Sequence, residues 1–339
     1  MINLKFFPDF EHSNKYQSML YCESHINNFN IQKLDNPFII PLDTDIVHFH
    51  WQHTIWDFVK NKKKFIENDF SELFSYKINK EKNIKTIWTI HNALPHQSKS
   101  LELDIKLMQK ISDESDIIHL LSDDSLSEIE KHITINHKKI IIVPHSNYDK
   151  FFKIEEKSMF KDKIVVGAVT KINSYKNFDL LFKAYVELKK IHNDIVLLIA
   201  GLGYDVEIMN KLKAESKNDN NIVVIDKFLS DEEFNRISNL IDIAVYPYSN
   251  ILNSGSTHCS FTFEHHVVVP KFKTLKGLNE LKFVSFFEPH SLKDLVKTLN
   301  FVIENKEYAK HKDDIKKWNN ENTSSIMSNK FFKEVGKLL

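Results

Sequence analysis

The stretch YPYSNILNSGST at residues 246–257, followed by a helical run and by VVVP at residues 267–270, is the most informative part of this sequence. It predicts a strand end, a short loop and a helix that begins at Ser254-Gly255-Ser256. The first N–H groups of a helix have no internal partner, and the helix dipole favours negative charge there. Ser254, Gly255, Ser256 and Thr257 are therefore candidate contacts for a bound diphosphate. An ordinary helix cap is the alternative, because Ser and Gly are good N-cap residues.

The composition is that of a soluble globular protein long enough for two domains. The chain has 339 residues, of which 42% are hydrophobic and 27% are charged. Its 46 basic and 46 acidic residues balance, so we expect no nucleic-acid partner, although a local basic patch stays open. The two cysteines are far apart in sequence, and no apolar run approaches the roughly 20 residues of a membrane span. We therefore expect a cytoplasmic protein.

Short, nearly continuous apolar runs alternate with amphipathic segments along the chain. Such runs are typical of buried parallel strands, and their alternation with helices predicts doubly wound α/β sheets. The expected strands are residues 46–51, 86–90, 117–121, 140–143, 164–169, 195–200, 222–225, 243–246 and 267–269. The expected helices are residues 16–27, 99–112, 125–132, 178–191, 205–214, 231–239 and 291–304.

A charged stretch at residues 149–163 separates the two series of strands and is the expected linker. We therefore expect a Rossmann-like N-terminal domain at residues 1–150, which would bind the acceptor, and a Rossmann-like donor domain at residues 151–310. Residues 311–339 have a helical pattern and are expected to pack back on the N-terminal domain. Because open α/β sheets bind ligands at the carboxyl ends of their strands, we expect the two domains to face one cleft.

Several segments, in order along the chain, carry a resemblance to a known family. They are NKYQSMLY at 14–21, DIVHFHW at 45–51, IWTIHNALPH at 87–96, IVPHSNY at 142–148, VGAV at 166–169 with YKN at 175–177, and IAGLG at 199–203. In this order they resemble the signatures of GT-B fold glycosyltransferases, and the chain is similar to family 4 of these enzymes with a Ser-Gly-Ser donor loop. The resemblance implies transfer of a sugar from a nucleotide diphosphate sugar.

The sequence departs from that family at positions near the donor. Many retaining members carry two Glu residues across the loop and helix of the second domain, where this chain has Ile251 and Cys259. The usual Gly and Pro before the last strand are replaced by Glu264 and His266. These departures leave the donor-sugar contacts and the stereochemistry open. Asn92 lies where some inverting relatives offer a carboxylate, and because an amide is no general base, it favours retention.

Two lysines, Lys171 and Lys176, follow the expected strand at residues 164–169 and precede the helix expected at residues 178–191. Charge develops on the diphosphate as the anomeric bond breaks, and fixed cations and N–H donors aimed there lower the barrier. We therefore predict that both ammonium groups bind the donor diphosphate together with residues 254–257. The alternative is that both lysines are solvated.

His91 directly follows an expected strand, so its side chain should enter the ligand-binding cleft. It could act as the catalytic acid–base near neutral pH or hydrogen-bond the transferred sugar. A capping or core-edge histidine is the alternative. Asn14, Asn92 and His96 are further candidates for acceptor or sugar contacts.

Phe228 and Leu229 follow another expected strand and could flank the nucleobase, or could be core residues. His48 and His50 share a strand face and, with His53, imitate a metal cluster. Because no cysteine or paired carboxylate completes that set, we expect no metal. No Gly-x-Gly-x-x-Gly opens a helix after a first strand, so a nicotinamide cofactor is not expected.

The leading interpretation is a metal-independent, retaining glycosyltransferase that needs no cofactor and uses a UDP- or GDP-linked sugar as co-substrate. The expected acceptor is a surface glycan or a lipid-linked sugar. A nucleotide-sugar epimerase and an inactive relative that binds sugar or nucleotide are the alternatives. Residues 58–74 mix lysine with phenylalanine, which predicts either a peripheral contact with the inner face of a membrane or a solvated helix with a buried apolar stripe.

Overall fold

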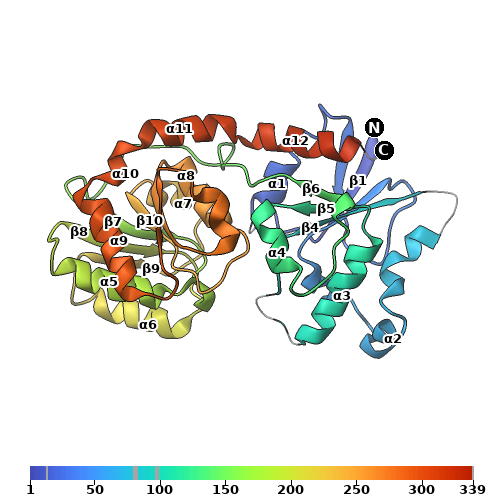
Figure 1. Cartoon of the computed structure of the whole chain (residues 1–339), viewed down its shortest axis with the longest axis horizontal. Coiled ribbons are helices and arrows are strands. Elements are labelled where there is room, and N and C mark those ends of the chain that lie inside the picture. The colour runs from blue at the N-terminus through green and yellow to red at the C-terminus, as the bar shows by residue number, and fades with distance from the viewer. Residues whose placement is uncertain (13, 79–82, 96–97, 99, 338–339) are drawn as a thin grey trace. The chain divides into compact units, whose positions relative to one another are not determined.

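The computed structural model describes residues 1–12, 14–78, 83–95, 98 and 100–337. These residues form two compact units, which can be followed by colour in Figure 1. The first unit comprises Met1–Ser146 and the described part of Ser324–Leu339, and the second comprises Asn147–Thr323. The tail expected at residues 311–339 is therefore divided between the two units, and the first boundary follows Ser146.

The first unit is built on a six-stranded parallel sheet in the order β2-β1-β3-β4-β5-β6. Its strands are β1 (Ile2–Phe7), β2 (Phe29–Lys33), β3 (Ile46–Phe49), β4 (Lys85–Ile90), β5 (Ile117–Leu120) and β6 (Ile140–Ile142). Its α-helices are α1 (Tyr16–Leu20), α2 (Lys62–Glu67), α3 (Leu101–Glu114), α4 (Leu126–Ile129) and α12 (Ser324–Gly336), with 3₁₀ helices at Gln52–Asp57, Ser71–Ile78, Asp123–Ser125 and His137–Lys139.

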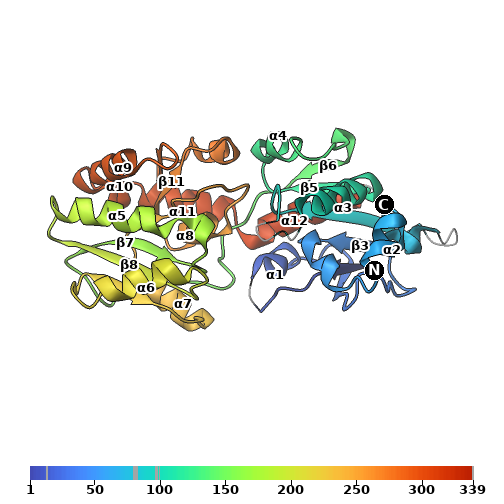
Figure 2. The ribbon, with the colours of Figure 1, turned by 90° about the horizontal axis from the view of Figure 1, so that it is seen from below.

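The strand order of this sheet reverses between β1 and β3. Since crossovers between parallel strands are right-handed, α1 lies on one face of the sheet, and α3 and α4 lie on the other. The last helix, α12, packs beside α1, as Figures 1 and 2 show. Ser328 on α12 links the two segments, because its hydroxyl donates to the Leu20 carbonyl over 2.7 Å and accepts from the Glu23 amide over 3.0 Å.

The second unit is built on another six-stranded parallel sheet, in the order β12-β11-β10-β7-β8-β9. Its strands are β7 (Ile164–Val169), β8 (Ile195–Ala200), β9 (Ile222–Ile225), β10 (Ile243–Val245), β11 (His266–Pro270) and β12 (Val284–Phe287). Its α-helices are α5 (Phe178–Lys189), α6 (Val206–Glu215), α7 (Asp231–Ser238), α8 (Gly255–Thr262), α9 (Leu292–Glu304), α10 (Glu307–Lys310) and α11 (Lys312–Glu321), with 3₁₀ helices at Ser174–Lys176 and Lys273–Leu278.

The strand order of the second sheet reverses between β7 and β10. The right-handed crossover rule therefore places α5 and α6 on one face, and α7 and α8 on the other. Both faces of the central strands are covered, which explains why every side chain of Ile195–Ala200 is at most 1% exposed. Two doubly wound, Rossmann-like α/β units are thus present, as the alternation of strands and helices predicts.

All nine predicted strands are present, with ends that differ by no more than two residues. The strands β1, β2 and β12 were not predicted. The helix predicted at residues 16–27 is helical only to Leu20, and the one predicted at residues 125–132 only over Leu126–Ile129. After Leu20 the chain carries Ser, His and Asn, which are weaker helix formers than Ala or Leu, and it reaches the left-handed Asn28 at φ 65°.

Candidate functional site

The carboxyl ends of β7 and β10 lie side by side where the strand order of the second sheet reverses, the place where open α/β sheets bind ligands. The segment after β7 carries Thr170, Lys171 and Lys176, and the segment after β10 leads into α8. A backbone hydrogen bond joins the two segments, because the Ser249 amide donates to the Tyr175 carbonyl over 2.8 Å. Two stretches that are about 80 residues apart in sequence thus form one candidate site.

Lys176 is the cation at the centre of this site, and its side chain is buried. It ends the short 3₁₀ helix Ser174–Lys176, after which the left-handed Asn177 (φ 53°) redirects the chain into α5. The Lys176 ammonium donates to Thr170 Oγ1, and it lies 3.5 Å from Ser256 Oγ at the start of α8. Thr170 Oγ1 and Ser256 Oγ are themselves 3.2 Å apart.

Burial, and secondarily the positive charge of Lys171, lowers the pKa of Lys176 to about 7. In the part of the chain that the structure describes, no carboxylate pairs with Lys176. Its partners are the two hydroxyls and the Tyr175 ring, whose centroid lies 5.9 Å from Nζ. A buried ammonium without a negatively charged partner is costly to charge, so a bound anion stabilises its protonated form. Lys171 is exposed at the start of the same segment, and partial loss of water around its ammonium lowers its pKa.

The start of α8 divides the four residues predicted there into two pairs. Ser254 is the N-cap, and its buried Oγ accepts from the Thr257 amide over 3.1 Å and from Thr257 Oγ1 over 2.8 Å. The Tyr248 hydroxyl lies 2.6 Å from the same oxygen. Ser254 and Thr257 therefore build the cap. Gly255 and Ser256 stay partly exposed, and by helix geometry their amides lack an intrahelical acceptor.

Three tyrosine rings support the cap. Tyr175 and Tyr248 stack with centroids 6.3 Å apart, and Tyr246 stacks on Tyr248 at 5.8 Å. Burial raises the pKa of the Tyr246 and Tyr248 hydroxyls, so both stay protonated. No role was predicted for these rings, although the pattern YPY after β10 was a signal for Tyr246 and Tyr248.

Glycine is required where the end of β8 approaches Thr170. Gly201 has φ 135°, a conformation that other residues rarely adopt, and a Cβ on it would lie 2.0 Å from the Thr170 carbonyl oxygen. This close approach fixes the backbone of Thr170, whose hydroxyl holds the Lys176 ammonium. Gly201, which the sequence placed only within the resemblance, thus helps to support the site.

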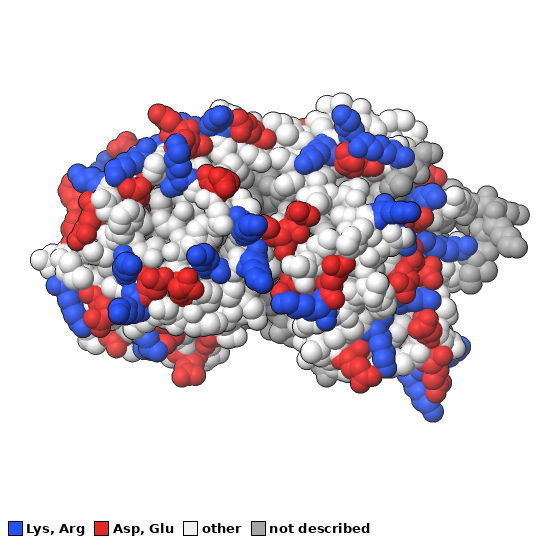
Figure 3. All heavy atoms as spheres, viewed as in Figure 1, with Lys and Arg blue, Asp and Glu red and all other residues white. Residues whose placement is uncertain are grey.

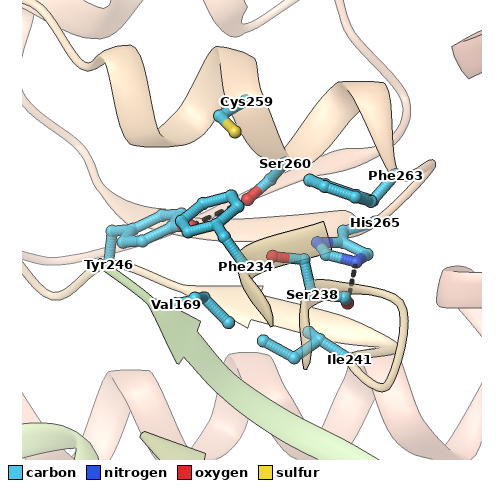
Figure 4. A pocket seen from close by; sticks show the side chains of 9 residues that line it. All are labelled: Val169, Phe234, Ser238, Ile241, Tyr246, Cys259, Ser260, Phe263 and His265. Carbon is cyan, nitrogen blue, oxygen red and sulfur yellow. Dashed lines mark hydrogen bonds between the residues drawn. The ribbon is translucent and has the colours of Figure 1, made fainter. Parts of the chain in front are cut away.

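A small cavity is lined by residues of β7, α7 and α8 and of the segments that follow α7, β10 and α8, as Figure 4 shows. Its free volume of about 10 Å³ is the room of about one water molecule. The Tyr246 hydroxyl lies 2.8 Å from Ser260 Oγ at one wall, and Cys259 lines another. Burial raises the pKa of the Cys259 thiol, so it stays neutral. With room for about one water molecule, the cavity is too small for a sugar or a nucleotide.

His91 follows β4 in the first unit and is mostly buried. Its ring stacks on Trp51 with centroids 4.0 Å apart, and the edge of the Tyr16 ring meets it at 4.9 Å. Its Nε2 lies 3.1 Å from Nδ1 of His50. Burial is the main cause that holds the pKa of His91 well below its usual value. The neighbouring imidazoles, His50 above all, lower this pKa further. His91 is therefore neutral near pH 7.

The other predicted contact residues lie in different surroundings. Asn14 lies just before α1, where its Oδ1 accepts from the Tyr16 amide over 3.0 Å, and Asn92 is partly buried and directly follows His91. Phe228 is 63% exposed, whereas the following Leu229 packs against the core of the second unit. The prediction for His96 lies outside the described residues.

Residues 58–74 do not form one amphipathic helix. Their helical part is α2, which has six residues, and Phe65, Phe70 and Phe74 are buried in the first unit. Because these three phenylalanines are buried, any contact with a membrane would involve the lysines of this region and the exposed Phe58. Membrane contact stays a prediction. Figure 3 shows basic and acidic side chains intermixed over the described residues of the face in view.

No helix among the described residues is long and apolar enough to cross a membrane. Nor do those residues bring together three or more histidine, cysteine or acidic side chains that could hold a metal ion.

Solved structures of low sequence identity share this fold. Sucrose-phosphate synthase from Thermosynechococcus elongatus is 9% identical, with a TM-score of 0.78 over 100% of this chain and 99% of its own. HepE from Anabaena, solved with UDP and glucose, is 10% identical, with a TM-score of 0.73 over 99% of this chain and 100% of its own. A glycosyltransferase from Rickettsia africae is 14% identical, with a TM-score of 0.72 over 99% of this chain and 98% of its own.

The fold is therefore the GT-B fold of glycosyltransferases, with two Rossmann-like domains. Residues 149–318 match the model of the family described as glycosyl transferases group 1, and the chain belongs to that family. The protein is thus a glycosyltransferase, as the resemblance implied. Among curated protein sequences, none matches this chain significantly.

Proposed function

We propose that this glycosyltransferase takes its sugar from a nucleotide diphosphate sugar, UDP- or GDP-linked, whose diphosphate binds at Lys176 and the start of α8. The observation that carries this proposal is the buried Lys176 ammonium, which is held between Thr170 and Ser256 and pairs with no carboxylate of the described residues. A diphosphate oxygen supplies the missing negative charge. The structurally similar HepE was solved with UDP-glucose, which supports the same class of donor here.

The geometry suits the chemistry of the leaving group. As the anomeric bond breaks, negative charge builds on the diphosphate, and Lys176 together with the amides of Gly255 and Ser256 stabilises that charge. One well-placed donor of this kind is worth roughly 3 kcal/mol of barrier. Lys171 adds a second, more mobile cation. With ammonium groups as counter-charge, we propose transfer that needs no divalent metal and no cofactor.

In the first unit, His91 is proposed to meet a hydroxyl of the donor sugar or of the acceptor, which we take to be a surface glycan or a lipid-linked sugar. The described partners of His91 are imidazole and aromatic rings, and the neighbouring Asn92 offers an amide in place of a basic carboxylate. An inverting mechanism needs a general base for the acceptor hydroxyl, which Asn92 cannot supply and for which His91, with its pKa held well below its usual value by burial, is a weak candidate. We therefore propose transfer with retention of the anomeric configuration.

The test is a panel of UDP-, GDP- and CMP-sugars incubated with the purified protein, with EDTA in half of the reactions. We expect slow hydrolysis or transfer with one UDP- or GDP-sugar that EDTA leaves unchanged, and NMR of the product to show a retained anomer. Lys176→Met is expected to lower kcat at least about a hundredfold, whereas the same change at the exposed Lys217 leaves it unaltered.

Three results contradict the proposal. Near-normal turnover by Lys176→Met removes that residue from the site. Interconversion of the nucleotide sugar without transfer indicates an epimerase, and nucleotide binding without any turnover indicates an inactive relative.

A further inference from the structure

A continuous line of buried hydrogen-bonding groups crosses one face of the first sheet. At its inner end, Nε2 of His119 donates to the Val143 carbonyl over 3.0 Å, and Nδ1 of the same ring lies 2.9 Å from Thr89 Oγ1. Thr89 on β4 and His119 on β5 are direct neighbours in register. Nε2 of His48 on β3 lies 2.7 Å from the same Thr89 oxygen.

The line continues outward to His91. Nδ1 of His48 lies 2.7 Å from the Tyr21 hydroxyl, and Nε2 of His50 lies 2.8 Å from that hydroxyl. Nδ1 of His50 then lies 3.1 Å from Nε2 of His91. We call these seven groups the histidine chain, which consists of the Val143 carbonyl, His119, Thr89, His48, Tyr21, His50 and His91.

Burial keeps every imidazole of the histidine chain neutral. His48, His50 and His119 are fully buried, and His91, at 8% exposed, is the least buried member. Desolvation is the main cause that lowers the pKa of all four rings, with a further contribution from neighbouring imidazoles at His48, His50 and His91. The pKa of His119 falls to about 4. Each ring therefore carries one proton, on Nδ1 or on Nε2.

The Val143 carbonyl fixes where the inner protons lie, because a carbonyl can only accept. His119 must donate from Nε2, which leaves a lone pair on Nδ1. The Thr89 hydroxyl must then donate to that lone pair, so its oxygen accepts from Nε2–H of His48.

The same reasoning fixes the outer protons. With its proton on Nε2, His48 has a lone pair on Nδ1, and the Tyr21 hydroxyl must donate to it. The Tyr21 oxygen accepts from Nε2–H of His50, and Nδ1 of His50 accepts from Nε2–H of His91. Only this arrangement satisfies all six hydrogen bonds with neutral groups. All four histidines are then Nε2–H tautomers.

We propose that the histidine chain holds His91 as the Nε2–H tautomer, so that its Nδ1 presents a lone pair to a hydroxyl group of the sugar or acceptor. His119, Thr89, His48, Tyr21 and His50 are positioning residues for this role. The inference rests on the proposed function, because the hydroxyl is taken to belong to a substrate of glycosyl transfer.

A lone pair fixed on Nδ1 of His91 determines which groups can form a hydrogen bond with this nitrogen. A hydroxyl or an N–H group can donate to Nδ1, whereas a carboxylate or a carbonyl oxygen would face an acceptor and lose its own hydrogen bond. His91 therefore favours a sugar with a free hydroxyl at that position and disfavours an acidic group there. No described residue hydrogen-bonds Nδ1 of His91, which leaves this nitrogen available.

The tautomers can be read directly by ¹⁵N NMR of the full chain labelled in its histidines, since protonated and unprotonated imidazole nitrogens differ strongly in chemical shift. His48, His50, His91 and His119 are expected to show Nε2–H and an unprotonated Nδ1 near neutral pH. Substitution of each histidine by glutamine assigns its signals. A protonated Nδ1 on His91 in the wild-type protein overturns the proposal.

Thr89→Val cuts the chain at its centre and frees the outer segment to reverse. His48 can then donate from Nδ1 to Tyr21, and the reversal passes through His50 so that His91 carries its proton on Nδ1. A shift of His91 towards the Nδ1–H tautomer is expected in Thr89→Val. Thr86→Val is the matched control, because Thr86 lies on the same strand, is also fully buried, and bonds Tyr76 outside the chain.

Tyr21→Phe removes another hydroxyl from the histidine chain, and it is expected to shift His91 towards the Nδ1–H tautomer in the same way. If either variant fails to fold, the other and the wild-type spectrum still decide. Unchanged His91 tautomers in both variants overturn the claim that the histidine chain sets them.

Transfer kinetics with the donor found in the panel complete the test. We expect kcat/KM to fall about tenfold in Thr89→Val and Tyr21→Phe, and less than twofold in Thr86→Val. If His91 has the reversed tautomer in these two variants but kcat/KM is unchanged, the proposed role of the histidine chain in transfer is overturned. If the wild-type protein transfers nothing, the proposed function fails and the hydroxyl assignment fails with it, whereas the tautomer stands or falls by NMR alone.

Discussion

Binding of a nucleoside diphosphate is expected to take up a proton, because Lys176 is only partly charged in the free protein. With a pKa of about 7, Lys176 is about half protonated at pH 7 and about one-tenth protonated at pH 8. A diphosphate within reach favours the charged ammonium, so the complex keeps the proton. Proton uptake should therefore be about 0.5 per molecule at pH 7 and about 0.9 at pH 8.

The same linkage sets how affinity depends on pH. Binding is tightest below pH 7 and weakens as the pH rises through the pKa of Lys176 in the free protein. Since apparent affinity scales with the fraction of the binding-competent form, it should fall about fivefold from pH 7 to pH 8. A further tenfold loss, or about 1.4 kcal/mol, is expected for the next pH unit.

Isothermal titration of UDP and GDP at pH 8, in Tris and in HEPES, measures the uptake, because these buffers release a proton with different heats. A terminal phosphate, with its second pKa near 6, is already deprotonated at that pH and contributes little. The exposed Lys217, changed to Met, should keep the buffer dependence, and Lys176→Met should abolish it. Equal heats in both buffers for the wild-type protein, or the same uptake in Lys176→Met, would refute the reasoning.

Three further predictions concern stability, each read from urea denaturation. Ser254→Ala removes the cap of α8 and one hydrogen bond of the Tyr248 hydroxyl, so we expect a loss of about 2 kcal/mol; a change below about 0.5 kcal/mol contradicts the cap. Phe331→Ala opens a cavity at a fully buried position under α12 and should cost about 3 to 5 kcal/mol, whereas an unaltered midpoint shows that α12 is not docked. Gly201→Ala should cost at least about 3 kcal/mol, while Gly336→Ala, where a Cβ meets nothing within 4 Å, should be neutral.

The strands that could be predicted are those with a nearly continuous apolar run, as is typical of strands buried on both faces. β8 (Ile195–Ala200) is such a strand. β1 (Ile2–Phe7) escaped prediction although it is next to the strand-order reversal, because Lys5 interrupts its apolar run. The structure shows why the lysine is tolerated: its ammonium donates to Gln32 Oε1 and pairs with Asp43, each over 2.8 Å. A partner 27 or 38 residues away in the chain cannot be read from the local pattern.

β2 and β12 escaped for a different reason. Both are edge strands with a single neighbour, and polar residues alternate into their sequences, as in the FNIQK of β2. The edge position alone does not explain the failure, because the edge strands β6 and β9 have continuous apolar runs and were predicted. The order of strands, which decides where a ligand binds, also depends on which strand lies at each edge, so periodicity alone could not give it.

The two candidate sites differ in how far sequence could lead to them, and the difference has a physical cause. Lys176 and Ser256 each follow the carboxyl end of a strand, and the rule that such ends meet at one edge brings two residues together from local patterns alone. The histidine chain needs more, because its members lie on or directly after five different elements, which are α1, β3, β4, β5 and β6. The spacing of His48 and His50 does show that they share a face. That spacing alone suggests a metal site. In the structure, however, the two rings hydrogen-bond Thr89, Tyr21 and His91 and so belong to the histidine chain. A shared face is thus a local property of one strand, but what that face does depends on the register of its neighbours.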